Sequence, residues 1–464
     1  MCSSDLDDNL YRIDDNNNAS VIGAGGGGDI SNASNLGSGD GLFAQKSGSN
    51  LEFKSLSAGT NISITSDSEI LTISSTAGGG SGIIVEGIGV GSSERCGNNN
   101  DASGSYSTAL GQCNTALGAC NTVSGGYFNI SSGNASTIGG GYGNTASGNT
   151  STIGGGYQNI ASCGNSTVSG GYCNTASGYN STIGGGCFNT ATGVATTIAG
   201  GVCNSLTSNC SFIGGGECNH NALASGWGVI AGGACNCIES EYTTIGGGCN
   251  NTASCYFSTV AGGQCNISSS RNSTVGGGCK NTASCCNSTI GGGSCNISSS
   301  RNSTVGGGQS NTASCNGSTV AGGCNNTASG RYSTVGGGCN NLSSGCNSTI
   351  SGGYCNTLTS DFSTIGGGFC NSNDLTAGFS IIGGGRCNCV TCFDSTVGGG
   401  CNNLSCNNYS TVAGGGGNIA SCKYSTVGGG YGNISSCCNS TVGGGCNNTS
   451  SGYSSTIGGG RCNT

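Results

Sequence analysis

The chain has 464 residues, of which 33% are hydrophobic, 6% are charged and 98 are glycine, and its net charge is −8. This composition excludes a conventional globular core, because it supplies too few apolar side chains to fill one. The acidic balance lacks the basic footprint of a nucleic-acid-binding protein, and no run of about 20 apolar residues predicts a membrane span. Such a chain can fill a thin core if identical turns stack and each adds one or two small apolar side chains to a shared column.

The N-terminal part of the chain differs from the rest. Residues 1–40 are polar and glycine-rich and predict a flexible, disordered leader, within which residues 2–6 look like a translated sequencing adapter. Residues 41–76 alternate apolar and polar residues around short polar turns, which predicts two hairpins, at about 41–56 and 61–73. Two hairpins this small bury little surface, so we expect them to be one subunit's share of a small β module.

A repeat dominates the remainder of the chain. Residues 77–100 predict a glycine-rich linker with a first strand, and residues 101–464 predict the repeat domain, which stops inside a repeat as if truncated. The phrase Ser-Thr-Ile-Gly-Gly-Gly at residues 288–293 returns with a spacing of fifteen at every step but two, and Asn-Thr-Ala-Ser stands between copies. This period predicts an all-β parallel solenoid of about 24 turns, roughly 110–120 Å long at one strand spacing per turn.

The strand period of two predicts which side chains enter the core. In the turn at residues 181–195, Ile183 is expected inside and Thr182 outside, and Ala191 is expected inside on a second short strand. The predicted core column consists of the Ile or Val before the glycines: Ile183, Ile213, Ile245, Val275, Ile290, Val305, Ile350, Val397 and Val442. The glycines permit positive φ and close approach of backbones, and stacked asparagines such as Asn189 predict a hydrogen-bonded side-chain ladder.

One outward row is not uniformly polar. The position before the inward Ala is mostly Thr but becomes apolar in several turns: Ile130, Ile160, Ile267, Ile297, Leu342, Ile419 and Ile434. We expect this row to pack against a neighbouring subunit.

Thirty-five cysteines accompany a single histidine, His220. Mixed Cys/His zinc sites are therefore disfavoured. A row of cysteines lies four or five places after the core residue: Cys173, Cys187, Cys203, Cys218, Cys235, Cys249, Cys265, Cys279 and Cys295. Stacked neighbours would lie about one strand spacing apart, which a disulfide tolerates, so the row predicts a disulfide ladder, with free thiols and metal or cluster binding as alternatives.

Two turns are longer by two residues, at 217–227 and 369–379. They match position by position and lie ten turns apart, which predicts a duplicated ten-turn block. Each is expected to project a bulge with an aromatic residue, and insertions in solenoids often map to a functional face. The candidate ligand-facing residues are His220, Trp227, Asp374 and Phe379. An insertion without function is the alternative.

The repeat phrases point to a family. Thr-Ile-Gly at 137–139 and Thr-Ala-Ser-Gly at 145–148 recur in the same order over about residues 101–464, and this pattern resembles the head repeats of YadA-like trimeric autotransporter adhesins. The resemblance implies a left-handed parallel β-roll in each chain, three chains side by side, and a surface adhesin that binds host or matrix molecules. The longer repeat and the cysteines depart from that family, and the given residues do not show the neck, stalk and membrane anchor that the resemblance would lead one to expect.

A second resemblance concerns the N-terminal module. Ser-Asn-Leu-Gly at 34–37, Gly-Leu-Phe at 41–43 and Gly-Thr-Asn-Ile at 59–62 resemble the phrasing of short β modules in tail fibres of phages and large viruses. Together the two resemblances imply an extracellular protein on a cell surface, such as an outer membrane, or on a virion.

The expected function is therefore attachment. We expect a homotrimeric fibre that binds a host receptor, glycan or matrix protein, with neither a cofactor nor a metal and with no nucleic-acid partner. The alternatives are a structural spacer or glycosylated coat rod, since Asn-x-Ser/Thr triplets are frequent, and an ice-binding solenoid with Thr-x-Ser rows. An enzyme is not expected, because no carboxylate pair recurs and no glycine corner is followed by the Lys-Ser/Thr of a phosphate loop.

Overall fold

The computed structural model describes residues 84–95, 99–222 and 226–464, together with six strands nearer the N-terminus. These six are β1 (Leu10–Ile13), β2 (Ala19–Ile22), β3 (Phe43–Ser47), β4 (Asn50–Phe53), β5 (Ile62–Ser66) and β6 (Leu71–Ser75). The adapter-like residues 2–6 and the glycine-rich stretch 77–82 lie outside the described residues. The described chain is all-β, and none of its segments forms a helix long and apolar enough to cross a membrane.

The six N-terminal strands form three antiparallel hairpins. Strand β3 pairs with β4 and β5 with β6, so both predicted hairpins are present. Strand β1 pairs with β2, from Leu10 opposite Ile22 to Ile13 opposite Ala19. The predicted leader therefore contains a hairpin, and its description as wholly disordered is wrong. The reason is local, because the Asp- and Asn-rich run at 14–18 separates two segments that each carry apolar residues.

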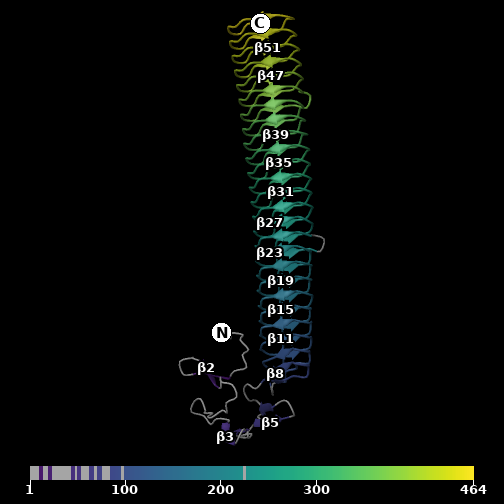
Figure 1. Ribbon diagram of the computed structural model, residues 1–464. Coiled ribbons are helices and arrows are strands. Elements are labelled where there is room, and N and C mark those ends of the chain that lie inside the picture. The colour runs from purple at the N-terminus through teal and green to yellow at the C-terminus, as the bar shows by residue number, and fades with distance from the viewer. Residues whose placement is uncertain are drawn as a thin grey trace. The chain divides into compact units, whose positions relative to one another are not determined.

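The repeat domain is a parallel β-solenoid of about 24 turns, as predicted (Figure 1). It begins earlier than residue 101, since β8 (Ser93–Arg95) already pairs with β9 (Thr108–Ala109) in the same parallel register as later turns. Strand β7 (Ile84–Glu86) precedes β8. Residues Glu86–Glu94 also belong to the same compact unit as the repeat domain.

Each turn carries two strands of two residues, which belong to two different sheets. The odd sheet runs through β9, β11 (Thr122–Val123) and each later odd-numbered strand to β55 (Thr456–Ile457). The even sheet runs through β10 (Thr115–Ala116), β12 (Ile130–Ser131) and each later even-numbered strand to β54 (Thr449–Ser450). Consecutive strands of a sheet are in register at a spacing of fifteen residues, except at the two longer turns, where Ile213 pairs with Ile230 and Ile365 with Ile382.

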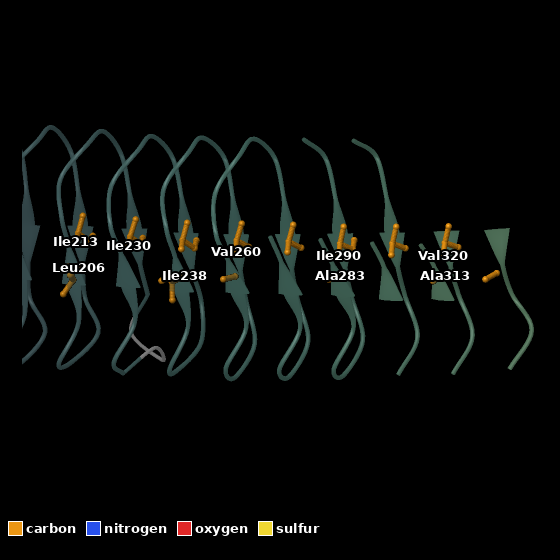
Figure 2. Packing of buried hydrophobic residues seen from close by; sticks show 14 of the residues in the cluster. Leu206, Ile213, Ile230, Ile238, Val260, Ala283, Ile290, Ala313 and Val320 are labelled. Atoms are coloured by element: carbon orange, nitrogen blue, oxygen red, sulfur yellow. The ribbon is translucent and has the colours of Figure 1, made fainter. Parts of the chain in front are cut away.

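The core is a single column of small side chains along the axis (Figure 2). The odd sheet contributes the Ile or Val before the glycines, and all nine predicted core residues are fully buried. The even sheet contributes mainly Ala, replaced by Leu206, Ile238, Leu358 and Val390 in some turns. Serine fills this position in most of the other turns, and there its hydroxyl is paired, as Ser268 Oγ lies 2.7 Å from Ser273 Oγ. The column is thin, and its buried polar groups are paired nearly throughout.

The predicted asparagine ladder is present and is buried up to Asn448. The backbone N–H of Asn281 donates to Asn266 Oδ1 at 3.0 Å, and Asn281 Nδ2 donates to the carbonyl oxygens of Gly277 and Gly293 at 2.8 and 2.9 Å. Equivalent bonds recur from Asn114 to Asn463. Each amide thus joins its own turn to the turns on both sides, which a buried polar side chain requires for stability.

The third glycine of the corner cannot be replaced without strain. Gly293 has φ +86°, and a Cβ there would lie 2.0 Å from the carbonyl oxygen of Gly308 and 2.7 Å from Asn296 Nδ2. The glycine and the asparagine ladder are therefore parts of one corner, because the amide reaches the carbonyls only where the backbones approach closely.

Candidate binding surfaces

The described residues contain no group of three or more His, Cys, Asp or Glu side chains able to hold a metal ion. What the rod presents instead is four long surfaces. Two are the outward faces of the odd and even sheets. The other two are edges, which we define by position: the first edge holds the residues four and five places after the core Ile or Val, and the second edge holds those eleven and twelve places after it. In the turn at 183–197 these are residues 187–188 and 194–195.

The two sheet faces differ in chemistry. The outward residue of the odd sheet is Thr in nearly every turn, interrupted at Phe212, Val229 and Ile381. The even-sheet row mixes Thr with apolar residues, of which Ile130 is 41% and Ile297 42% exposed. The row predicted to pack against a neighbouring subunit therefore lies on the outside of the rod, as that prediction requires.

One residue in each edge adopts the left-handed conformation. Cys203 on the first edge has φ 55° and Cys210 on the second has φ 50°. Side chains of successive turns then stack directly over one another. On the first edge, Tyr157 stacks on Tyr142 and on Tyr172, with ring centroids 5.1 and 5.0 Å apart and interplanar angles of 7°. These ladders add ring–ring contacts without using the core.

The longer turns do not place their aromatic residues at a bulge tip. Trp227 lies on the second edge with φ 55° and stacks on Tyr242 of the next turn at 4.9 Å and 3°. Phe379 occupies the same place in the second longer turn and stacks on Phe362 at 4.9 Å and 4°. The expected aromatic bulge is therefore wrong in this detail, because the two extra residues are accommodated before the aromatic residue and the regular edge resumes at it.

The other two candidate residues lie elsewhere on the same turns. His220 is exposed on the outward row of the even sheet, in register with Ser205 on one side and Cys237 on the other. Asp374 is exposed and precedes Leu375, which is 76% exposed in the loop of the second longer turn (Figure 1). The structure thus does not gather His220 and Trp227, or Asp374 and Phe379, into one site.

Sequence reasoning missed a buried change in the longer turns. Asn221 and Asn373 stand where regular turns place Ala in the core, and both are fully buried. Ser208 Oγ donates to Asn221 Oδ1 at 2.8 Å, and Ser360 Oγ donates to Asn373 Oδ1 at 2.9 Å. The signal was present in the sequence as an Ala-to-Asn change in both copies of the longer turn.

Most cysteines lie on the edges, and Cys237 and Cys389 lie on the outward row of the even sheet. A further group, which includes Cys163, Cys255 and Cys285, lies ten places after the core residue, directly before the second edge. None of the 33 cysteines that the structure describes is joined to another in it, and the disulfide ladder stays a prediction. Two columns of three occur on the first edge, ten turns apart: Cys203, Cys218 and Cys235, and Cys355, Cys370 and Cys387. Partial desolvation raises the pKa of the middle thiols Cys218 and Cys370, and the thiol of the preceding turn raises it further. A raised pKa lowers the thiolate fraction at neutral pH and so slows oxidation.

Charge is distributed unevenly along the rod. Residues 102–216 contain no Asp, Glu, Lys or Arg. From residue 102 onward, all carboxylates lie in the two longer turns or in a turn beside them: Glu217, Glu239, Glu241, Asp361, Asp374 and Asp394. Residues 242–360, between these two acidic zones, contain four cations and no carboxylate, a net charge of +4. The rod thus has a neutral, an acidic, a basic and a second acidic zone in succession.

No protein-family model and no curated protein matches the chain.

Proposed function

We propose that this chain is the rod of an extracellular fibre, on a cell surface or a virion, that attaches its bearer to a host cell or surface ligand as a homotrimer. The observation that carries the proposal is the unbroken parallel stack from β9 to β55, whose interior is filled by paired amides and small apolar residues. A long, stiff, regular rod with chemically varied outer surfaces suits display at a distance from the surface that anchors it.

The even sheet supports the trimer. Its outward row exposes Ile130, Ile160, Ile267 and Ile297 to a similar degree, at separations of two turns within each pair. Exposed apolar residues at a regular pitch gain burial when copies of the rod lie side by side. Sedimentation velocity or mass photometry of the chain tests this step, and a monomeric rod would remove the trimer from the proposal.

Attachment is tested directly with cells. Labelled protein is expected to bind cultured cells saturably, and a competing excess of unlabelled protein is expected to abolish the signal. A Trp227→Ala variant tests the longer turn, because Trp227 is 52% exposed beside Tyr242. Equal binding by the variant would withdraw Trp227 from the receptor-binding surface, and no saturable binding by the unmodified chain to any cell type would reject attachment.

A structural spacer is the second candidate function. The neutral zone favours it for that part of the rod, because residues 102–216 offer no charge for steering or for ionic recognition. A chain lacking residues 117–191, an integral number of turns, separates the two functions. Unchanged cell binding by this shortened rod would assign the neutral zone to spacing and leave recognition to the remainder.

A further inference from the structure

The second edge of the basic zone carries three arginines at alternate turns. Arg271, Arg301 and Arg331 occupy the same position of their turns, thirty residues apart. Backbone bonds hold this row in register, since the N–H of Asn287 donates to the Arg271 carbonyl at 3.0 Å and the N–H of Asn302 donates to the Cys286 carbonyl at 3.0 Å. Two strand spacings separate successive arginines, about 9.6 Å.

The first two arginines border a hollow in the surface. A depression of about 330 Å³ is lined by Arg271, Asn272, Cys286, Asn287 and Arg301. It exists because the turn between the two arginines carries only the short Cys286 side chain, whose thiol lies 3.5 Å from Ser270 Oγ. The side-chain amides beside it form their own ladder, with Asn272 Nδ2 donating to Asn287 Oδ1 at 3.1 Å and Asn287 Nδ2 donating to Asn302 Oδ1 at 3.0 Å.

These guanidinium groups have no anionic partner in their own zone. Arg271, Arg301 and Arg331 are exposed, and the sequence from 242 to 360 supplies no carboxylate to pair with them. Arg331 instead lies over the ring of Tyr332, 5.1 Å from its centroid. An exposed guanidinium presents a planar fork of N–H donors that matches carboxylate and sulfate oxygens.

We propose that this row, which we call the arginine row (Arg271, Arg301 and Arg331), binds a linear anionic polysaccharide that carries sulfate or carboxylate groups along its length. The polysaccharide lies along the second edge, with anionic groups on successive arginines and one sugar unit over the hollow at Cys286. Acidic zones at both ends of residues 242–360 confine the polyanion to this stretch by repulsion. The inference rests on the proposed attachment function and names its ligand class.

The spacing favours a polysaccharide over a nucleic acid. Duplex DNA presents one phosphate per about 1.7 Å of axis and is bound through dense clusters of cations. The arginine row offers a cation only every second turn, and the Tyr332 ring that could stack on a base is already covered by Arg331. An acidic polysaccharide repeats its charges with each disaccharide, which is the sparser pattern that the row fits.

The test measures binding of the full chain to immobilised heparin, hyaluronan and duplex DNA at salt concentrations of about 0.15 M or below. At these concentrations the Debye length is about 8 Å or more, so contacts between neighbouring charges are not fully screened. The triple variant Arg271→Gln/Arg301→Gln/Arg331→Gln is compared with Lys280→Gln/Arg386→Gln/Arg461→Gln, which removes the same charge from the first edge. We expect the first variant to weaken polysaccharide binding by about tenfold or more and to flatten its salt dependence, as expected when close ionic contacts are lost. The matched control is expected to change binding by less than about twofold. The charges that it removes lie on the other edge, where salt screens most of their attraction for a polyanion bound to the second edge.

Each outcome decides the proposal. Binding to heparin alone supports sulfate as the recognised group, and binding to hyaluronan as well supports carboxylate. Equal losses in the two triple variants, an unchanged first variant, or DNA binding as tight as heparin binding would each overturn the proposal. Cell attachment that persists in the arginine-row variant would reject this ligand class while leaving the attachment function intact. Retained heparin binding without cell attachment would reject the attachment function while leaving the polysaccharide-binding site intact.

Discussion

A regular turn such as residues 281–295 and the longer turn at 369–379 share one backbone register but have different interiors. In the regular turn, the ladder amide of Asn281 is bonded on both sides and the core position holds Ala283. In the longer turn, the ladder amide Asn371 is retained, while the core position holds a second buried amide, Asn373. Among the described residues, Asn373 Nδ2 is one of the few buried polar atoms without a hydrogen-bond partner. The comparison shows that the ladder and the glycine corner are fixed, whereas the rest of the turn tolerates change.

The largest expected effect separates the two kinds of buried asparagine. Asn281→Ala removes two donated bonds and leaves the N–H of Asn296 without its Oδ1 acceptor. Since each orphaned buried group costs about 1–3 kcal/mol, we expect a loss of about 3 kcal/mol or more in unfolding free energy, measured by denaturant titration. Asn373→Ala, the matched variant, is expected to stay within about 1 kcal/mol of the unmodified chain, because the lost bond from Ser360 is offset by removal of the buried, unpartnered Nδ2. Equal losses would contradict the distinction.

The glycine corner offers a second matched pair. Gly293→Ala forces a Cβ to 2.0 Å from the Gly308 carbonyl oxygen at positive φ, whereas a Cβ at Gly292 meets nothing within 4 Å. We expect Gly293→Ala to lower stability by about 2–3 kcal/mol through strain and displacement of the ladder, and Gly292→Ala to change it by less than about 0.5 kcal/mol. Thermal unfolding followed by circular dichroism measures both. A destabilised Gly292→Ala would show that the corner is constrained by more than the close approach.

Stacking at the edges is expected to matter less. Trp227→Ala removes a parallel ring contact with Tyr242, and such pairs contribute about 0.5–1.5 kcal/mol. The loss is expected in denaturant unfolding followed by circular dichroism. Leu375→Ala serves as the control, since Leu375 is 76% exposed, and it is expected to have no measurable effect. A loss of more than about 3 kcal/mol in unfolding free energy for Trp227→Ala would contradict this, because it would show that the edge, and not only the core column, stabilises the turn.

Removal of the insertion is expected to have the smallest effect. Ala377 is fully buried at the position that Gly345 and Ser360 occupy in preceding turns, so Leu375 and Thr376 are the two extra residues. Their deletion restores a fifteen-residue turn without touching the register of Ile365 and Ile382. We expect hydrogen exchange of neighbouring amides to be unchanged outside the loop. Increased exchange across several turns would show that the longer loop supports the stack.

Much of the fold could be predicted because each turn repeats the same local information. Ile290 and the eight other predicted core residues follow from the strand period, and all nine are buried. Asn189 was assigned to a ladder from its recurrence, and its Nδ2 bonds to Gly185 and Gly201 are present. The pairing of β1 with β2 was harder to predict, because neither strand recurs along the chain and the surrounding sequence is mostly polar.

The candidate site was less predictable from single positions. Trp227 and His220 were chosen because they are rare residues in a longer turn, yet the structure places them on different surfaces of the rod. The arginine row was readable as a spacing of thirty residues but not as a hollow, because the hollow depends on the size of Cys286 in the turn between.

The sequence alone determined the period, the residues of the core and the residues of the ladder, since these depend on alternation along one strand and on identical neighbours above and below. Only the tertiary structure decided which side chains meet on an edge, how a turn of seventeen residues returns to register, and where a short side chain between two long ones leaves a space. Those features arise from contacts between turns whose residues differ, and no single repeat contains that information.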